Sequence, residues 1–166
     1  MKISFSPSPV YSPHGRERTQ GEDLTSVSEN DLRWYYFLGQ LSISHTDVEI
    51  GPSWGWIPLF DAMCSVRNAM RSAREGSGVW KVDFTENAEL ITFEFDRGSL
   101  RATPTYLETT LQCSVDEFVD AGTRFIAGEL QRVMLEYPAL AGNQAVRALA
   151  QAVRRIASAP RIRRRQ

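Results

Sequence analysis

The chain has 166 residues, 42% of them hydrophobic and 23% charged, which suits one soluble domain with a substantial core. No apolar run approaches the roughly 18 residues of a membrane span, and residues 1–5 lack the roughly 7-residue apolar stretch of a signal peptide, so we expect a cytoplasmic protein without membrane association. The formal net charge of −1 conceals a strong asymmetry. Residues 1–136 hold 12 basic and 20 acidic residues, a net of −8, whereas residues 137–166 hold seven arginines and no acidic residue.

The N-terminal part of the chain begins as a short strand and continues as a polar segment. Ile3 and Phe5 alternate on one face, whereas residues 6–31 are rich in proline, serine and charge. Such a composition cannot bury enough surface to offset its ordering entropy, so we expect a mobile loop over 6–31. The aromatic run over 32–38 and the alternation of residues 41, 43 and 45 then predict strands, with a further short extended piece at 48–50.

The second half of the chain alternates between helical and extended patterns. Pro58 opens a predicted helix that ends at residues 75–78, and three strands follow around 80–84, 91–95 and 100–102, with a break near Pro104. Ser114 and Glu117 form a capping box that starts a long helix, and a last helix covers about 143–158. The order β-ββ-α-βββ-α-α predicts the α+β class. We expect a single domain over 1–158 with an antiparallel sheet of about five strands, helices packed on one face, and a flexible basic tail at 159–166.

Few residues point to catalysis. His14 and His45 are the two histidines, and no nucleophile elbow, P-loop or dinucleotide-binding motif occurs, so we predict no catalytic residue and no cofactor. Cys64 and Cys113 lie in apolar, periodic settings, which indicates buried free thiols. One alternative is a metal-dependent enzyme in which His45, Asp47 and Glu49 alternate along a strand and bind a divalent ion from one face.

Carboxylates are concentrated in the first hairpin of the three-strand unit. They are Asp83, Glu86, Glu89, Glu94 and Asp96, and alternation places them on an outward face or at a loop tip. Such an array is either a solvated sheet face or a surface that steers and docks a basic protein partner. Trp54 is the predicted anchor, because tryptophan is enriched at interface hot spots, whereas Trp56, beside the helix, is predicted to be buried.

The arginines of the last helix and tail support a second alternative. Arg147, Arg154 and Arg155 lie on the helix, followed by Arg161, Arg163, Arg164 and Arg165. Arginine-rich segments bind nucleic acid by neutralising phosphates, but the aromatic interleaving of single-strand binders is absent from this segment. A solvated helix face that complements the helix dipole is the simpler interpretation.

The order of several segments resembles that of known bacterial proteins. Residues 56–61 open a helix, 80–85 and 90–95 are strand-like, and 137–143 separate two helices. Over roughly residues 32–150 this layout is similar to small actinobacterial proteins of uncharacterised families and to immunity proteins of polymorphic-toxin systems. The resemblance implies a non-enzymatic protein that binds a cognate toxin and occludes its active site. We therefore expect a binding protein that sequesters a basic protein partner through Trp54 and the carboxylates at 83–96.

Overall fold

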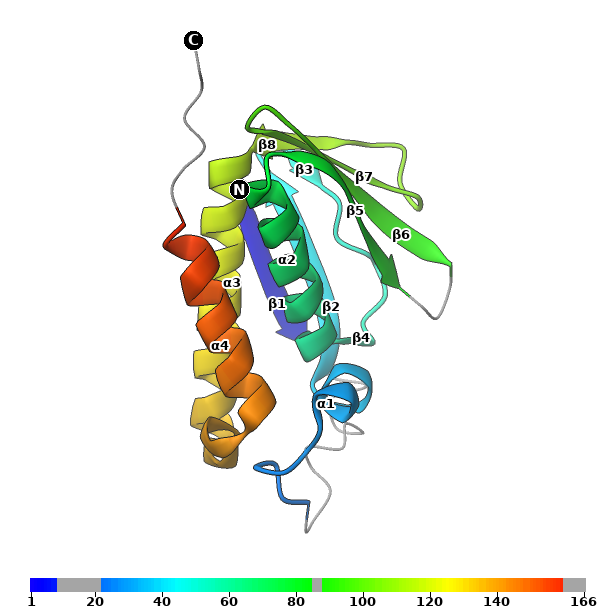
Figure 1. Cartoon of the computed structure of the whole chain (residues 1–166). Coiled ribbons are helices and arrows are strands. Elements are labelled where there is room, and N and C mark those ends of the chain that lie inside the picture. The colour runs from blue at the N-terminus through cyan, green and yellow to red at the C-terminus, as the bar shows by residue number, and fades with distance from the viewer. Residues whose placement is uncertain (9–21, 85–87, 160–166) are drawn as a thin grey trace.

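The computed structural model describes residues 1–8, 22–84 and 88–159 (Figure 1). Within these ranges the chain forms four α-helices and two antiparallel four-stranded sheets. The predicted α+β class is confirmed, but the prediction of one sheet of about five strands is wrong. Alternation identifies strands without identifying their partners, and here the partners fall into two separate groups.

Sheet A joins the N-terminus to the middle of the chain. It contains β1 (Lys2–Pro7), β2 (Leu38–His45), β3 (Val48–Glu49) and β4 (Ile57–Pro58), with β2 paired to the other three. β1 and β2 are antiparallel, with Ile3 opposite Ile43 and Phe5 opposite Leu41, so both strands bury the same alternate positions. Gly39 is required at the end of this pair, because a Cβ atom there would collide with the Phe5 ring and the Ser6 carbonyl oxygen.

Sheet B is an antiparallel sheet of four strands in sequence order. They are β5 (Ser77–Phe84), β6 (Glu89–Asp96), β7 (Ser99–Pro104) and β8 (Leu111–Ser114). The three predicted strands are confirmed as β5, β6 and β7. The phase change near Pro104 marks the end of β7, and the chain returns as β8, which the sequence pattern did not reveal as a separate strand. Arg97 and Gly98 form the tight β6–β7 turn, both at positive φ (47° and 85°).

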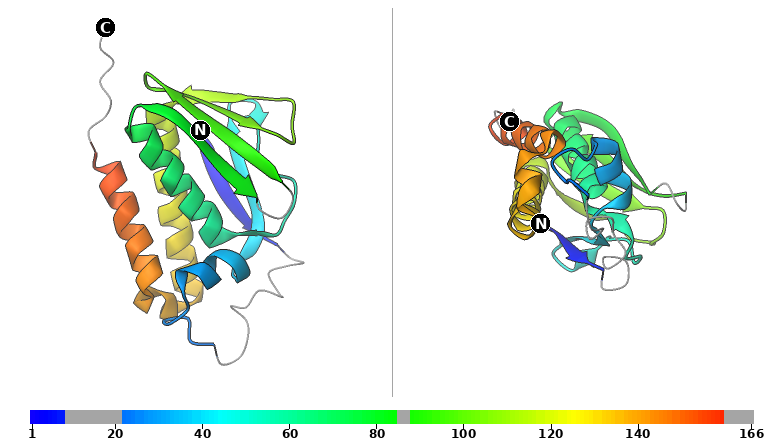
Figure 2. Two further views of the ribbon diagram at one scale, coloured as in Figure 1. Left: turned by 45° about the vertical axis from the view of Figure 1, so that its right-hand side comes forward. Right: turned by 90° about the horizontal axis from the view of Figure 1, so that it is seen from below.

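The longer helices pack against both sheets. α2 (Leu59–Arg74) and α3 (Val115–Glu136) lie together; α2 contacts β4 and β5, and α3 contacts β1 and β8 (Figures 1 and 2). The 3₁₀-helix η3 (Pro138–Gly142) and α4 (Gln144–Ala157) follow, and α4 packs on α3. The predicted capping box is confirmed: the Ser114 hydroxyl accepts from the Glu117 amide, and the Glu117 carboxylate accepts from the Ser114 amide. In the described part of the chain, no helix combines the length and apolarity needed to cross a membrane.

The aromatic segment 32–38 is not a strand, as predicted, but belongs mainly to α1 (Glu29–Tyr35). Ser28 caps this helix by accepting from the Asp31 amide at 3.0 Å, and the helix buries Leu32 while Tyr36 is buried just beyond its end. Phe37 then adopts a positive φ of 55° before β2 begins at Leu38. The helix cap and the burial of two residues four apart override the strand preference of aromatic side chains.

The end of the predicted 6–31 loop packs against the C-terminal helices. Leu24 is buried, and the Asn143 side-chain amide donates to the carbonyl oxygens of Leu24 and Val27, both at 2.9 Å. Asn143 also caps α4 by accepting from the Ala145 amide at 2.9 Å. This one buried side chain therefore joins residues 24–27 to the start of α4. The other part of the predicted loop, 9–21, and the tail beyond residue 159 lie outside the described residues.

Candidate functional site

A cleft of about 360 Å³ opens where α1, the start of α2 and the end of β5 meet. Seven of its ten lining residues are hydrophobic, and the other three are ionisable. The complete lining consists of Arg33, Trp34, Leu38, Trp54, Trp56, Ile57, Pro58, Asp61, Asp83 and Phe84. Segments of both sheets and of two helices therefore contribute to one concave surface, as small-molecule and side-chain binding sites commonly require.

Trp54 is the centre of an aromatic cluster at the back of this cleft. Its ring lies 6.0 Å from that of Trp56 in a stacked arrangement, and 5.6 Å from Phe84 and 5.1 Å from Tyr106 in edge-to-face arrangements. These distances and angles are the favourable ones for aromatic pairs. Trp54 and Trp56 are both half-buried, so the prediction that Trp56 is buried is wrong. Trp56 stays partly exposed because it lines the cleft.

Tyr106 connects the aromatic cluster to sheet A. Its hydroxyl donates to the Ile50 carbonyl oxygen at 2.6 Å, which joins the β7–β8 connection to sheet A. Burial, together with the negative charge of Glu89, raises the pKa of Tyr106 well above its ordinary value. The phenol therefore remains a neutral donor, and the ring is fixed where it contacts Trp54.

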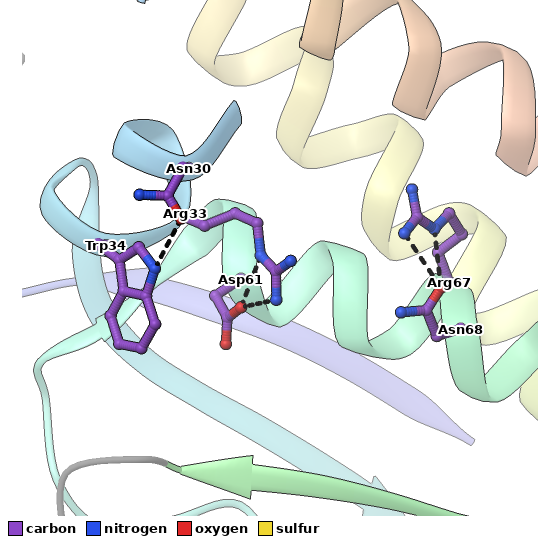
Figure 3. Close-up of polar contacts among 6 residues, drawn as sticks. All are labelled: Asn30, Arg33, Trp34, Asp61, Arg67 and Asn68. Atoms are coloured by element: carbon purple, nitrogen blue, oxygen red, sulfur yellow. Dashed lines mark hydrogen bonds and ion pairs between the residues drawn. The ribbon is translucent and has the colours of Figure 1, made fainter. Parts of the chain in front are cut away.

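Trp34 forms the outer edge of the cleft and is 43% exposed. Its indole Nε1 donates to the Asn30 side-chain oxygen at 3.2 Å, one helical turn earlier in α1 (Figure 3). The bond restricts the indole on the helix surface. A large aromatic ring is thereby held in a partly solvated position at the mouth of the cleft.

An ion pair between Arg33 and Asp61 lies in the cleft wall. Arg33 Nε and Nη2 donate to the same oxygen, Asp61 Oδ1, at 2.9 and 2.5 Å, and Figure 3 shows the second carboxylate oxygen pointing away from the guanidinium. Partial burial by itself would lower the pKa of Arg33, but the hydrogen bonds and charge of Asp61 outweigh it and raise that pKa. Within the described residues, Asp61 Oδ2 accepts no further hydrogen bond.

Asp83 is the second carboxylate of the cleft. It is exposed at the end of β5, next to Phe84. Across the described ranges it makes no hydrogen bond or ion pair. The cleft therefore combines aromatic walls with one carboxylate and one further carboxylate oxygen that are available to a ligand.

The other predicted acidic residues do not join Asp83. Glu94 and Asp96 are exposed on the outer face of sheet B, where Glu94 is in register with Arg101 and Asp96 lies 3.8 Å from the Arg97 guanidinium. Glu89 is half-buried and accepts from the Thr105 hydroxyl. Glu86 lies outside the described residues. Of the predicted partner-binding set, the structure brings together Trp54 and Asp83 alone among the described residues.

The proposed metal ligands do not lie along one strand. The chain turns at Thr46, which has a positive φ of 51°, so His45 ends β2 while Glu49 lies on the returning strand β3, opposite Ser44. Asp47 is exposed in the turn, and Glu49 accepts from the Ser42 hydroxyl at 2.7 Å. The predicted alternation is therefore wrong. In the described ranges, no three His, Cys, Asp or Glu side chains are grouped so as to hold a metal ion.

The two cysteines are free thiols with little nucleophilic character. Both are free thiols, as predicted, but only Cys64 is buried; Cys113 is half-buried, so the prediction of its burial is wrong. Burial raises the pKa of Cys64, and burial together with the charge of Glu117 raises the pKa of Cys113 to about 12. Both thiols therefore remain protonated at neutral pH.

The basic residues of α4 serve different roles. Arg147 donates to the carbonyl oxygens of Ala141 and Gly142, at 3.1 and 2.9 Å, and so stabilises the end of η3. Arg154 and Arg155 are exposed in the last turn of the helix. The remaining arginines of the nucleic-acid alternative, Arg161 to Arg165, lie outside the described residues.

Sequence reasoning missed Arg33, Trp34 and Asp61 as site residues. The predicted strand over residues 32–38 gave no reason to place Arg33 near the start of α2. In the structure Arg33 lies on α1 and reaches Asp61 from that helix. A signal was present: Ser28 followed three residues later by Asp31 is a helix N-terminus pattern, and Asp61 occupies the first turn of α2.

The fold and the site together define an α+β protein with an aromatic, partly acidic cleft. Comparison with protein families, curated proteins and solved structures finds no match to this chain.

Proposed function

We propose that the protein is a non-enzymatic binding protein that sequesters a basic protein partner, in the manner of an immunity protein, with the aromatic cleft at the centre of the contact. The observation that carries this proposal is the pairing of exposed aromatic surface with uncommitted carboxylate oxygens of Asp61 and Asp83. Tryptophan and desolvated charge pairs are the groups that dominate protein–protein affinity.

The surface around the cleft has the apolar character of a docking site. Trp34 and Tyr35 are 43% and 47% exposed on adjacent positions of α1. Leu107, also 43% exposed, follows Tyr106, whose ring contacts Trp54. Of these exposed residues, Trp34 lines the cleft itself, and a large apolar side chain at a concave surface supports protein association more than scattered exposure does.

The charge of the chain supports a basic partner. Residues 1–136, which contain every residue of the cleft, carry a net charge of −8. Such a body attracts a cationic partner at long range and raises the association rate, an effect that falls as salt increases. We therefore expect salt to weaken binding mainly through slower association.

Affinity purification from the native host tests the proposal. Wild-type protein and the double variant Trp34→Ala/Asp83→Asn are used as baits, and Asp47→Asn, which removes an exposed carboxylate from the β2–β3 turn, is the matched control. The proposal predicts one basic protein that is retained by wild type and the control and lost by the double variant. Retention by all three baits, or binding by the purified partner that does not change between low and high salt, would contradict it.

A further inference from the structure

We infer that the cleft accepts an arginine side chain of the partner, bound between the tryptophans and the uncommitted oxygens of Asp61 and Asp83. This inference rests on the proposed function, because it names the group that the partner inserts. The inferred ligand is a planar cation that contacts aromatic rings and donates charged hydrogen bonds at the same time.

The charges of the cleft favour a single cation. Its described ionisable lining consists of Arg33, Asp61 and Asp83, which leaves one negative charge in excess. Arg33 uses one oxygen of Asp61, and the other points away from it (Figure 3). An anionic ligand would face Asp83 without compensation, whereas one entering cation would neutralise the site.

The aromatic lining favours a guanidinium over an ammonium group. Trp34, Trp54 and Trp56 all contribute to the lining, and tryptophan is the strongest aromatic partner for cations. A guanidinium is flat, weakly hydrated and able to stack on an indole while its edge donates to carboxylates. A lysine ammonium is more strongly hydrated and offers no flat face, so it loses more on entering a cleft with apolar walls.

The protein already contains this recognition chemistry. Arg33 shows that a guanidinium fits against Asp61 with both Nε and Nη2 within hydrogen-bond distance of one oxygen. Charge-assisted bonds of this kind are roughly twice as strong as neutral ones. The other oxygen of Asp61 and the carboxylate of Asp83, both residues of the cleft lining, are the acceptors that we assign to a second guanidinium.

The test uses the full chain labelled with ¹⁵N and titrated separately with N-acetylargininamide, N-acetyllysinamide and N-acetylcitrullinamide. The chain has four tryptophans, so the indole N–H signals report the site directly. Trp34, Trp54 and Trp56 line the cleft, while Trp80, whose Nε1 is buried, belongs to β5 outside it and serves as an internal control. We expect saturable shifts of the three cleft indoles with the arginine probe and none of Trp80.

Matched compounds and variants make the result specific. The neutral citrulline probe, which has nearly the same shape, should bind at least about tenfold more weakly, and the lysine probe several-fold more weakly. Asp83→Asn should weaken the arginine probe about five- to tenfold, whereas Asp47→Asn should leave it unchanged. Because Asp83 is exposed, its variant is expected to keep the fold, which the unchanged Trp80 signal verifies.

Equal binding of the citrulline and arginine probes, stronger binding of the lysine probe, or an equal shift of Trp80 would overturn the inference. If the variant Trp34→Ala/Asp83→Asn loses the protein partner but wild type binds no arginine probe, the cleft contacts the partner through other chemistry. That outcome rejects the arginine site and leaves the proposed function standing. Binding of the arginine probe without any partner captured through the cleft would reject the proposed function instead.

Discussion

The aromatic cleft and the outer face of sheet B both display carboxylates, but in opposite surroundings. Asp61 and Asp83 line the cleft together with tryptophan and phenylalanine residues, and the only cation of the described lining, Arg33, contacts a single oxygen of Asp61. On the outer face, Glu94 and Asp96 are exposed beside Arg101 and Arg97. We therefore expect the two acidic pairs to differ in how strongly they bind a cation.

The physical difference lies in solvent. A charge pair on an open sheet face contributes at most about 1 kcal/mol, because water and salt screen it. A carboxylate against apolar rings loses water when a partner covers it, so its pairing with a cation is stronger and more selective. The apolar surroundings of each carboxylate therefore predict binding better than the density of carboxylates in the sequence.

Replacing the central ring should have the largest effect on the cleft. We expect Trp54→Ala to reduce the free energy of unfolding by about 3 kcal/mol, because Trp54 contacts the rings of Trp56, Phe84 and Tyr106. Urea denaturation followed by circular dichroism measures the change. Trp34→Ala, at the exposed edge, should cost no more than about 1 kcal/mol. A smaller loss for Trp54→Ala than for Trp34→Ala would show that the cluster does not support the fold.

Removing one carboxylate from each region compares them directly. Asp83→Asn should weaken binding of the purified partner about tenfold, equivalent to about 1.4 kcal/mol, while Glu94→Gln should change it less than twofold. Isothermal titration calorimetry at one fixed salt concentration gives both values. The opposite order would move the binding surface from the cleft to the outer face of sheet B.

The capping box tests whether stability and binding are separate. We expect Ser114→Ala to reduce the free energy of unfolding by about 1 kcal/mol without changing partner affinity, since α3 begins away from the cleft lining. The hydrogen bonds from Ser114 lower the pKa of Glu117, so the folded carboxyl has a lower pKa than the unfolded one. Its contribution to stability is present above the unfolded value near 4.5 and is lost as pH falls through the folded pKa.

Unfolding measured from pH 7 down to pH 3 should therefore show a less steep loss of stability in Ser114→Ala than in wild type. The difference should be small, because Glu117 is exposed. An identical acid dependence in the two proteins would mean that the Ser114 hydrogen bonds do not hold the Glu117 carboxylate in solution.

Arg33→Gln should have the smallest effect on stability. It should also strengthen binding to the cleft, whereas Asp83→Asn should weaken it. Both partners of the Arg33–Asp61 pair are partly exposed, so its loss should cost less than about 1 kcal/mol. The cleft then gains a second excess negative charge, and we expect the arginine probe to bind several-fold more tightly. Weaker binding in this variant would indicate that Arg33 holds Asp61 in its binding position.

Local patterns in the sequence predicted much of the fold because they depend on near neighbours. The helix predicted to open at Pro58 is confirmed as α2, which buries Leu59, Met63, Val66 and Met70, and the Ser114 capping box starts α3 as predicted. The tight turn at residues 97 and 98 joins β6 to β7. In contrast, the aromatic composition of residues 32–38 predicted a strand, although Ser28 caps a helix, α1, that covers most of this segment.

The sequence by itself therefore determined the α+β class, the positions of most helices and strands, and the candidacy of Trp54 and Asp83. Tertiary structure alone decided that the strands form two sheets, that Asp83 separates from Glu94 and Asp96, and that Arg33 and Asp61 join Trp54 in one cleft. The physical reason is the sequence separation of the interacting residues. Periodicity, caps and turns are set by residues a few positions apart, whereas strand pairing and the meeting of α1, α2 and β5 depend on contacts between distant segments that no local pattern encodes.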